Sequence, residues 1–481
     1  MNDHRAIGAR LWVIVVALGF GLTTARAEQA NAIADNFPGT AFETITPEAA
    51  GWSAEQLAAA KSWSLQIAPA AAVMIVQHGR VVAEWGDTAT KSNLHSIRKS
   101  LLSALYGNAV EKHLIDPTAT IGSLGIDDND PGLTEIEKTA TVVDLLKARS
   151  GVYHAALYET PGMAKRRPAR GSHPPGTFWY YNNWDFNALG TIYEQATKQS
   201  IFDAFDQQIA HPIGMQDYVA SDGQYVSGKE SEHRAYPIRM SARDLARFAL
   251  LYLHEGRWKD RQLVPASWVR ESTQAYSQAY TDAGPGLGYA YLWWTGFITE
   301  MGAPVVKMPP GSFEGIGYEG QWAFVIPALD LVIIHRINSD FPHKREPDFR
   351  QMGRLLWLIL TAAGDKDAGP DISLAHATGQ RLDGEALKAA LSGKTLVFGR
   401  NLERGPRAWP TRADGTTSVL VGPEREERFT GTWRIDDRSR YCRTLNDPTD
   451  SAEHCFVVVV NGATVKLFDG EGLMRFDMRA E

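Results

Sequence analysis

Two short apolar runs near the start of the chain predict a β-hairpin. Residues 72–77 and 80–85 are dominated by apolar side chains, and His78-Gly79 stands between them. Short apolar runs joined by a two-residue turn that contains glycine are typical of paired antiparallel strands. A second pair of apolar runs lies within residues 321–335, interrupted by a Pro-Ala-Leu-Asp turn. The chain therefore places strand-forming sequence at two points far apart along its length.

Apolar residues at helical spacing, preceded by capping residues, predict helices between and after these strands. The expected helices begin after Ser53, near Ser96, after Ser241 and near Asp348. The stretch from about 113 to 310 reads as helices and loops. The order of these elements predicts an α+β fold: strands come first, then a long helical insertion, then further strands and a final helix. One antiparallel sheet, flanked by helices and drawn from both ends of the domain, would carry an all-helical subdomain.

The composition changes after the fourth of these helices and predicts a second domain. Residues 364–370 have the Gly, Asp and Pro content of a linker. Further on, residues 456–468 contain two strand-like runs on either side of Asn461-Gly462, which is a strong hairpin pattern. The expected division is a main domain over residues 28–375 and a small β-rich domain of unknown role over residues 376–481.

The N-terminus has the pattern of a cleaved signal peptide. Arg5 and Arg10 precede an apolar stretch over residues 11–22, and a small-x-small cleavage site ends at Ala27. The apolar stretch is too short to span a bilayer comfortably. We therefore expect export, a mature chain that starts at Glu28, a periplasmic or secreted location, and no stable membrane insertion after cleavage.

The chain has two cysteines, Cys442 and Cys455, and both lie in the expected C-terminal domain. An even pair in an exported protein suggests one disulfide, with two buried free thiols as the alternative. Neither cysteine lies near Ser96 in the sequence, and Ser96 is the candidate nucleophile described below. The positions of the cysteines therefore do not favour thiol catalysis.

Composition and motif searches exclude several classes of function. The formal net charge of −7 and the lack of a basic run argue against a nucleic-acid partner. No Gly-x-Ser-x-Gly occurs, so an α/β-hydrolase nucleophile is not supported. The 13 histidines show no metal-ligand spacing, and we expect neither a metal nor another cofactor.

Ser96-Ile97-Arg98-Lys99 is the most informative sequence in the chain. Serine and lysine three residues apart on a helix share one face. An amine beside a hydroxyl is the arrangement that a serine nucleophile needs when no histidine serves as its base. Ser96 would also sit at a helix N-terminus, where the backbone dipoles favour developing negative charge. The alternative is a solvated pair on a surface helix.

A second cluster offers a phenol and an amide. In the sequence Trp179-Tyr-Tyr-Asn-Asn183, two overlapping Tyr-x-Asn readings exist, Tyr180 with Asn182 and Tyr181 with Asn183. The phenol could pass a proton to a leaving group, and the amide could hold the lysine or a substrate carbonyl. The alternative is an aromatic loop that only packs.

A third candidate is the glycine-rich sequence Gly315-Ile-Gly317-Tyr318, just before the apolar run at 322–326. Glycines at a strand start allow the backbone to approach a ligand closely. A main-chain N–H there could join that of Ser96 in holding an oxyanion. An ordinary glycine-rich loop is the alternative.

Taken together and in this order, the three motifs resemble the serine β-lactamase and penicillin-binding-protein superfamily. The resemblance is strongest to its class-C-like esterase branch, which includes the 6-aminohexanoate oligomer hydrolases. It extends over roughly residues 45–363 and is carried by residues 95–105, 143–151, 175–183, 187–190, 240–244 and 320–322.

The resemblance implies a β-lactamase-like fold and a role for each motif. Ser96 would be the acylating nucleophile, Lys99 its base and Tyr181 the proton relay. Asn183 would be a polar partner at the site, because Pro175-Gly176 sets the register. The N–H groups of Ser96 and Tyr318 would form the oxyanion hole.

One departure from the family pattern bears on the substrate. Many relatives carry Lys-Thr-Gly or His-x-Gly on the third strand, where this chain has Gly315-Ile-Gly317 and no cation. That cation usually meets a substrate carboxylate. Its absence argues against penicillins and D-Ala-D-Ala peptides and favours neutral esters or amides. The expected partner is a small-molecule ester or amide, or a peptide-like substrate. D,D-peptidase or β-lactamase activity and a catalytically silent binding protein remain the alternatives, and the C-terminal domain could bind a cell-envelope ligand.

Overall fold

A nine-stranded sheet forms the centre of the first domain in the computed structural model, which describes residues 36–279, 287–297, 306–340, 346–369, 373–398, 407–422, 424–448, 451–470 and 472–481. The strand order is β1-β3-β2-β15-β14-β13-β12-β11-β10. The strands are β1 (Glu43–Thr44), β2 (Ala71–Gln77), β3 (Arg80–Trp85), β10 (Ser277–Ala279), β11 (Leu287–Tyr289), β12 (Trp294–Thr295), β13 (Phe313–Gly317), β14 (Gln321–Ile326) and β15 (Leu331–Ile337). All neighbours are antiparallel except β1 and β3.

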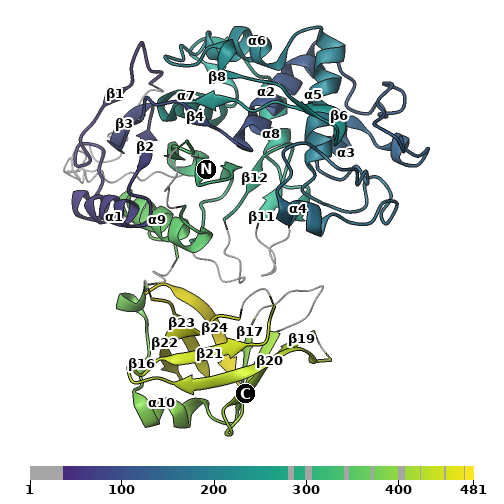
Figure 1. Cartoon of the computed structure of the whole chain (residues 1–481). Coiled ribbons are helices and arrows are strands. Elements are labelled where there is room, and N and C mark those ends of the chain that lie inside the picture. Colours follow the sequence, from purple (N-terminus) through teal and green to yellow (C-terminus); the bar gives the residue numbers. More distant parts are fainter. Residues whose placement is uncertain are drawn as a thin grey trace, which may run out of the picture.

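Helices cover both faces of this sheet (Figure 1). Helices α1 (Ala54–Ile67) and α9 (Phe349–Ala362) pack together over one face. Helices α2 (Ile97–Glu111) and α7 (Ala242–Leu253) lie against the other. Because strands β2, β14 and β15 are covered on both faces, they are continuous apolar runs rather than alternating ones.

The expected α+β fold is confirmed, including the hairpin at His78-Gly79 and the helix starts at Ser53, Ser241 and Asp348. The insertion carries the remaining helices of this domain and three small ladders. The helices are α3 (Val142–Leu146), α4 (Pro161–Arg166), α5 (Asn183–Thr197), α6 (Ile201–Phe205) and α8 (Ala266–Ser272). The paired strands are β4 (Ser92–Asn93) with β7 (Arg239–Met240), β5 (Val226–Gly228) with β6 (Ser231–Ala235), and β8 (Arg257–Trp258) with β9 (Arg261–Gln262).

One detail of the first domain differs from the sequence-based expectation, and one open alternative is decided. The stretch from 113 to 310 was expected to hold helices and loops, yet β10, β11 and β12 extend the main sheet there. Strands of two or three residues are too short to show a period. The glycine sequence at 315–317 lies within strand β13, as its match to a strand of the family implied, and it is neither a loop nor the start of the following apolar strand. Glycine has a low strand propensity, and the segment is held as a strand by its antiparallel pairing with β14.

The C-terminal residues form a closed β-barrel. Eight strands follow one another in an antiparallel meander, and the first pairs with the last. They are β17 (Lys394–Phe398), β18 (Arg407–Thr411), β19 (Thr416–Val421), β20 (Glu426–Ile435), β21 (Tyr441–Leu445), β22 (His454–Asn461), β23 (Thr464–Phe468) and β24 (Met474–Ala480). A short strand, β16 (Gln380–Arg381), joins β22, and helix α10 (Gly384–Leu391) packs its leucines into the barrel core. Closure leaves these eight strands without a free edge.

The predicted hairpin of β22 and β23 is present with its turn one residue later than expected. Asn461 still pairs with Thr464, so Gly462 and Ala463 form the two-residue loop. Gly462 has a φ of 58°, the left-handed conformation that such a loop requires. Cys442 and Cys455 lie directly opposite each other on β21 and β22 and are joined as a disulfide.

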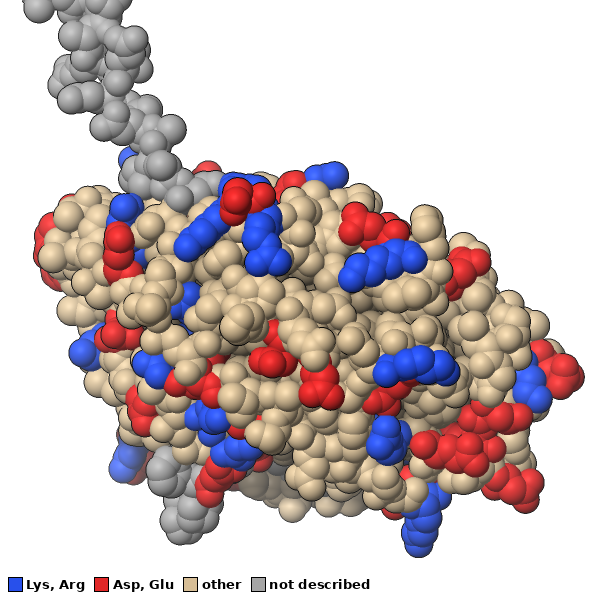
Figure 2. Space-filling view, turned by 90° about the horizontal axis from the view of Figure 1, so that it is seen from above, with Lys and Arg blue, Asp and Glu red and all other residues tan. Residues whose placement is uncertain are grey.

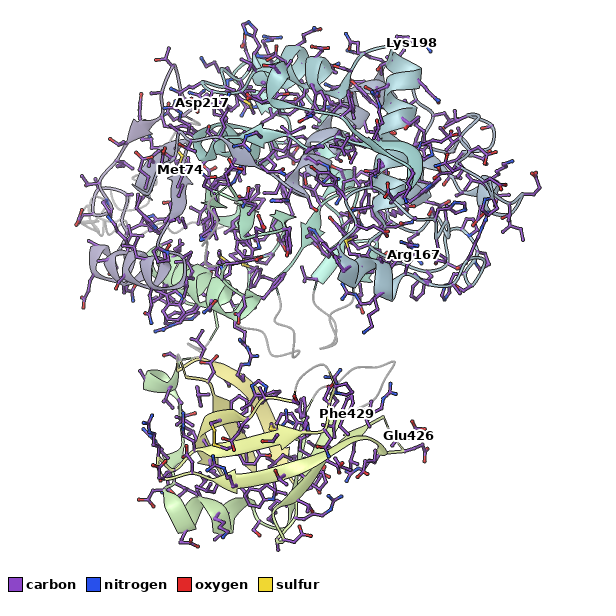
Figure 3. The ribbon with its side chains drawn as sticks, in the orientation of Figure 1. Met74, Arg167, Lys198, Asp217, Glu426 and Phe429 are labelled. Carbon is purple, nitrogen blue, oxygen red and sulfur yellow. A yellow bond between two sulfur atoms is a disulfide. The ribbon has the colours of Figure 1, made fainter. Side chains whose placement is uncertain are left out.

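Side chains of the barrel also contact the first domain. Leu473 is buried in the core beneath α1 and α9, and Ser373 bridges to it through the backbone. Figure 3 shows the side chains of the two domains, with Met74 on β2 and Phe429 on β20 labelled. On the face in Figure 2, basic and acidic side chains are interspersed.

The predicted signal peptide lies outside the described residues. Among the helices that are described, none combines the length and the apolar character needed to cross a membrane. Export therefore stays a prediction from the sequence.

Glu314 is a buried carboxyl group in the central sheet. Its side chain is fully buried, and neither carboxyl oxygen has a hydrogen-bond partner among the described residues. The next residue, Gly315, faces α2, so Glu314 points to the other face, toward α1 and α9. Burial raises the pKa of Glu314 well above its usual value, so the folded protein keeps this carboxyl protonated.

Replacing Glu314 with glutamine is expected to stabilise the protein at alkaline pH. Above the ordinary glutamate pKa the unfolded chain releases this proton while the folded chain keeps it, so the stability of the wild type falls as pH rises. In Glu314→Gln the melting temperature should rise by roughly 2–4 °C at pH 8 and change little near pH 5. Thermal melting followed by circular dichroism measures both shifts. An equal shift at the two pH values would contradict a protonated Glu314.

Candidate active site

Ser96, Lys99 and Tyr181 meet at the N-terminal end of α2. Ser96 is the residue that precedes the helix, and Lys99 lies one turn further on. The Lys99 Nζ atom is 2.9 Å from Ser96 Oγ and 2.7 Å from Tyr181 OH, so the amine bridges the two hydroxyls. The local helical spacing brings the first two together, and the fold brings in Tyr181 from 82 positions along the chain.

The surroundings of Lys99 favour an uncharged amine. The side chain is 1% exposed, and its Nζ lies over the rings of Tyr181 and Phe186 at 4.5 and 4.6 Å. Burial, with a smaller contribution from the charge of Arg98, holds the pKa of Lys99 well below its usual value. Burial also raises the pKa of Tyr181 to about 12. Burial thus favours a free amine able to accept a proton, beside a phenol that stays protonated at neutral pH and can donate one.

The start of helix α5 holds Tyr181 in place. Asn182 caps this helix, accepting from the N–H of Trp184. Its amide donates to Val152 O at 2.6 Å and to Asp185 Oδ1 at 2.8 Å. The Trp184 indole donates to Asp128 Oδ2 at 2.6 Å. Tyr181 thus directly precedes a helix start that is held by the hydrogen bonds of Asn182 and Trp184.

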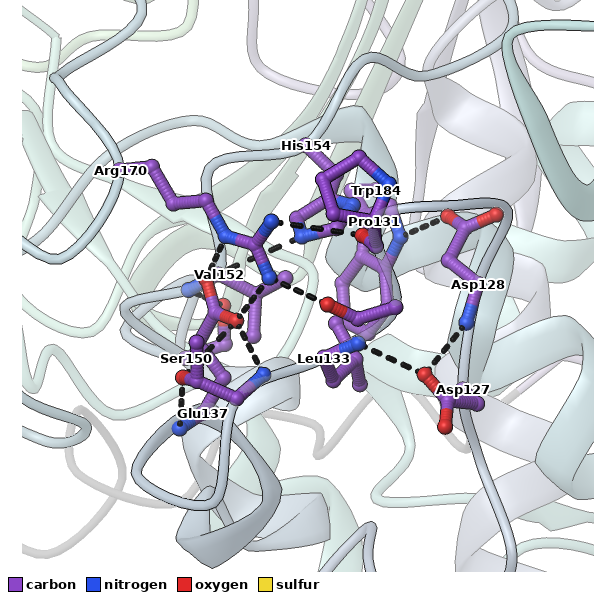
Figure 4. Close-up of polar contacts among 12 residues, drawn as sticks. Asp127, Asp128, Pro131, Leu133, Glu137, Ser150, Val152, His154, Arg170 and Trp184 are labelled. Atoms are coloured by element: carbon purple, nitrogen blue, oxygen red, sulfur yellow. Dashed lines mark hydrogen bonds and ion pairs between the residues drawn. The ribbon is translucent and has the colours of Figure 1, made fainter.

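A polar network behind α5 fixes the loops on which this helix start rests (Figure 4). Arg170 donates to both carboxylate oxygens of Glu137, at 3.1 and 2.8 Å. Asp127 accepts from the backbone N–H of Leu133 at 2.7 Å, and Arg170 also donates to Pro131 O at 3.3 Å. These partners come from separate segments with no periodic pattern, so no local sequence pattern points to them.

The structure distinguishes the two Tyr-x-Asn registers. Tyr180 donates its hydroxyl to Met163 O at 3.0 Å, away from Lys99, whereas Tyr181 contacts Lys99. Asn183 is the first residue of α5 rather than part of an extended segment, and its amide donates to Tyr158 O at 2.6 Å. The contact between this amide and Lys99 that the sequence suggested is therefore replaced by a contact to a backbone carbonyl. The Asn183 Oδ1 atom is buried with no hydrogen-bond partner among the described residues.

Strand β13 runs alongside the start of α2. A Cβ added at Gly317 would lie 2.4 Å from Leu94 O, and one added at Gly315 would lie 3.3 Å from Ile97 Cγ2. The strand therefore passes the nucleophile segment at a distance that only glycine permits at Gly317. Tyr318, the next residue, is exposed, and its ring meets that of His95 edge-on at 5.8 Å.

His95 lies just before the start of α2, outside the helix. It has a φ of 48°, and its Nε2 is 3.2 Å from Glu319 Oε2 in the turn after β13. Burial lowers the pKa of His95, so a neutral ring makes this contact at neutral pH. The residue before the nucleophile is thereby joined to the turn after Gly317.

Arg336 is a buried residue that the sequence analysis missed. It lies on β15 and donates to Gln321 Oε1 and to Ser92 Oγ, both at 2.6 Å. Burial lowers its pKa to about 9. Through these bonds Arg336 joins the turn end of the β13–β14 hairpin, at Gln321, to the segment that leads into Ser96. An arginine inside an apolar strand is the one sequence signal that could have pointed to it.

One aromatic side of the site also comes from a distant segment. Trp294, on β12, stacks on the ring of Tyr181 with centroids 5.3 Å apart. Trp293 and Tyr153 are buried in the core, while Tyr158 is exposed. Among the described residues, the single cluster with metal-ligand geometry contains Cys442 and Cys455, whose sulfurs are bonded to each other.

The Beta-lactamase family profile matches residues 58–355, more than half of the chain. The chain belongs to the beta-lactamase family. The family and the fold are those of serine β-lactamase-type hydrolases, which agrees with the resemblance seen in the sequence. The C-terminal barrel lies outside the match.

Other comparisons find more distant similarity. An uncharacterized protein of Alkalihalophilus pseudofirmus is 22% identical over 299 residues, which is 56% of this chain and 84% of that protein. A penicillin-binding protein homologue from Pyrococcus abyssi, described as octameric, is 14% identical with a TM-score of 0.49, covering 89% of this chain and 99% of the other. A Bacillus anthracis protein provisionally described as a 6-aminohexanoate-dimer hydrolase is 20% identical with a TM-score of 0.48, covering 68% and 89%.

Proposed function

We propose that the protein is an exported serine hydrolase that cleaves ester or amide bonds of small substrates through an acyl-enzyme on Ser96. The observation that carries the proposal is the position of Lys99 Nζ, within hydrogen-bonding distance of both Ser96 Oγ and Tyr181 OH. A buried neutral amine between two hydroxyls can take a proton from one and return it through the other. Family membership is consistent with this chemistry.

In the proposed reaction, Ser96 Oγ attacks the substrate carbonyl carbon while its proton passes to Lys99 Nζ. A bond forms between Oγ and the carbon, and the carbonyl oxygen becomes an oxyanion near the N–H groups of Ser96 and Tyr318. The proton then moves from Lys99 through the Tyr181 hydroxyl to the leaving oxygen or nitrogen, and the bond from the carbon to that atom breaks. Water hydrolyses the acyl-enzyme by the reverse proton path and regenerates Ser96.

The substrate class follows from the side chains around the strand. Gly315 stands where many relatives carry a cation, and the space beside it is taken by Ile97 and Ser100. Trp294 and Tyr181 offer an aromatic surface next to the nucleophile. We therefore propose neutral esters or amides with an apolar or aromatic part, in preference to penicillins and peptides that end in a carboxylate.

The test is the intact mass of the protein after incubation with a fluorophosphonate probe. Wild-type protein should gain one phosphonyl group, and Ser96→Ala should gain none. The matched control is Ser103→Ala, which removes another buried serine hydroxyl from the same helix and should still be labelled. A folded wild type that takes up no probe would overturn the proposal in favour of a non-catalytic binding protein. The same spectrum, recorded on protein from the periplasm or culture medium, tests cleavage before Glu28.

A further inference from the structure

The two proposed oxyanion donors belong to segments that are far apart in the sequence. Ser96 directly precedes α2, and Tyr318 lies in the turn between β13 and β14. An oxyanion hole stabilises charge only when both N–H groups reach the same oxygen at hydrogen-bonding distance. The fold must therefore hold the spacing between these two segments.

His95 and Glu319 are the direct neighbours of the two donors, and their side chains meet. His95 Nε2 lies 3.2 Å from Glu319 Oε2, and each side chain is 18% exposed. The His95 ring also meets the ring of Tyr318 edge-on, with centroids 5.8 Å apart. The residue before one donor thus contacts both the other donor and the residue that follows it.

Both residues have a backbone conformation that side chains seldom adopt. The φ angle is 48° at His95 and 63° at Glu319. Residues other than glycine keep a positive φ where their surroundings hold them, and such residues are concentrated at functional sites. Each of the two lies in a turn next to a proposed donor, so a contact between their side chains restrains both turns at once.

Polar contacts that start at this pair form a closed circuit. Glu319 O accepts from Gln321 Nε2 at 3.0 Å, and Gln321 Oε1 accepts from Arg336 Nε at 2.6 Å. Arg336 Nη2 donates to Asn93 O at 3.3 Å, and Asn93 Oδ1 accepts from the N–H of His95 at 2.9 Å. The contact of His95 with Glu319 closes the circuit, so the two segments are joined twice.

We propose that His95 and Glu319 are positioning residues whose contact sets the distance between the N–H groups of Ser96 and Tyr318. The inference rests on the proposed function, because that function assigns the two N–H groups to the oxyanion. Arg336 holds the start of β14, whereas the contact of His95 with Glu319 acts on the residues directly beside the donors. The pair itself makes and breaks no bond in the reaction.

Loss of this contact is expected to weaken the transition state more than the bound substrate, because the oxyanion forms only during the reaction. Glu319→Ala should lower kcat on a neutral aryl ester by about 10-fold and leave KM nearly unchanged. Glu319→Gln, whose amide oxygen can still accept from the imidazole, should recover most of that loss. His95→Ala should match Glu319→Ala. The double variant should be no worse than either single one, because each removes the same contact.

A second histidine–carboxylate pair in the same sheet provides the matched control. His78 Nδ1 lies 2.6 Å from Asp330 Oδ2 and joins two other turns, at the opposite end of β14 from Tyr318. The φ angle is 49° at His78 and 47° at Asp330, so alanine meets the same kind of backbone strain as at the test positions. His78→Ala and Asp330→Ala should both keep the wild-type kcat and KM.

The outcomes separate this inference from the proposed function. If fluorophosphonate labels the wild type, kcat decides. An unchanged kcat in Glu319→Ala, an equal fall in Asp330→Ala, or effects of the two test variants that multiply in the double variant would overturn the inference. If the probe never labels the wild type, the serine hydrolase is overturned, and hydrogen exchange of residues 92–98 and 315–321 decides the inference. Faster exchange of both segments in Glu319→Ala, but not in Asp330→Ala, supports the contact as their link, and unchanged exchange overturns it. Thermal melting confirms that each variant is folded.

Discussion

Replacing Lys99 with methionine is expected to lower the rate of acylation by about 1,000-fold, with no loss of folding. Methionine has a similar length and fills the space over Tyr181 and Phe186, but it cannot accept the proton of Ser96. The measurements are the rate of fluorophosphonate labelling and kcat/KM on a neutral aryl ester. Both should fall together, because the amine acts in the bond-forming step.

The pH profile adds a second expectation for the same variant. In the wild type, kcat/KM should rise with pH as Lys99 loses its proton, and the low pKa of Lys99 brings this rise to a lower pH than an exposed lysine would give. The residual activity of Lys99→Met should lack that rise. The pKa of Tyr181, raised to about 12, keeps the phenol protonated across the same range.

Stability separates a chemical effect of Lys99→Met from misfolding. A lysine whose pKa is lowered in the folded state reduces stability as pH falls, because the unfolded chain binds the proton more readily. The melting temperature of Lys99→Met should therefore equal or exceed that of the wild type near neutral pH. Lys147→Met is the matched control, since Lys147 also lies over a tyrosine ring, 4.1 Å from Tyr276, and its variant should be fully active. Full labelling of Lys99→Met would overturn the role of Lys99 as base.

Gly317→Ala is expected to lower kcat/KM by about 100-fold. The new Cβ would lie 2.4 Å from Leu94 O, a backbone atom that cannot rotate away. Either β13 or the segment before Ser96 must then shift, and the proposed oxyanion donor at Tyr318 would shift relative to the nucleophile. A displacement of this kind acts on the transition state, so kcat should fall more than KM rises.

Gly315→Ala provides the matched control for this variant. Its new Cβ would lie 3.3 Å from Ile97 Cγ2, a side-chain atom that can adjust, and activity should fall by less than about 10-fold. Gly317→Ala should still be labelled slowly at Ser96, unlike Ser96→Ala. Equal activity of Gly317→Ala and the wild type would show that the spacing between β13 and the start of α2 does not place an oxyanion donor.

Local sequence patterns predicted much of this protein. The spacing of Ser96 and Lys99 predicted their contact because a helix places residues three apart on one face. Capping residues such as Ser241 and Asp348 predicted helix starts, and apolar runs predicted β14, β15 and the hairpin of β22 and β23. Each of these features depends on residues close together in the chain, so a single sequence carries enough information.

Contacts between distant segments were decided only by the tertiary structure. The choice of Tyr181 over Tyr180 rested on a family resemblance, and its reach to Lys99 depends on how the start of α5 is anchored. The glycines of β13 have low strand propensity and left a loop as an open alternative, and pairing with β14 decides that they form a strand. Closure of the barrel depends on β17 meeting β24, which no local pattern encodes.

There is a physical reason why the sequence predicts some features and only the fold decides others. Helix spacing, capping and turn formation are set by interactions within a few residues, and the sequence by itself determined the serine–lysine pair, the helix starts and the two-domain order. The lowered pKa of Lys99, the burial of Arg98 and the close approach of Gly317 to Leu94 depend on what the fold packs around them. Burial and charge at a point in space come from many segments at once, and these were decided by the tertiary structure alone.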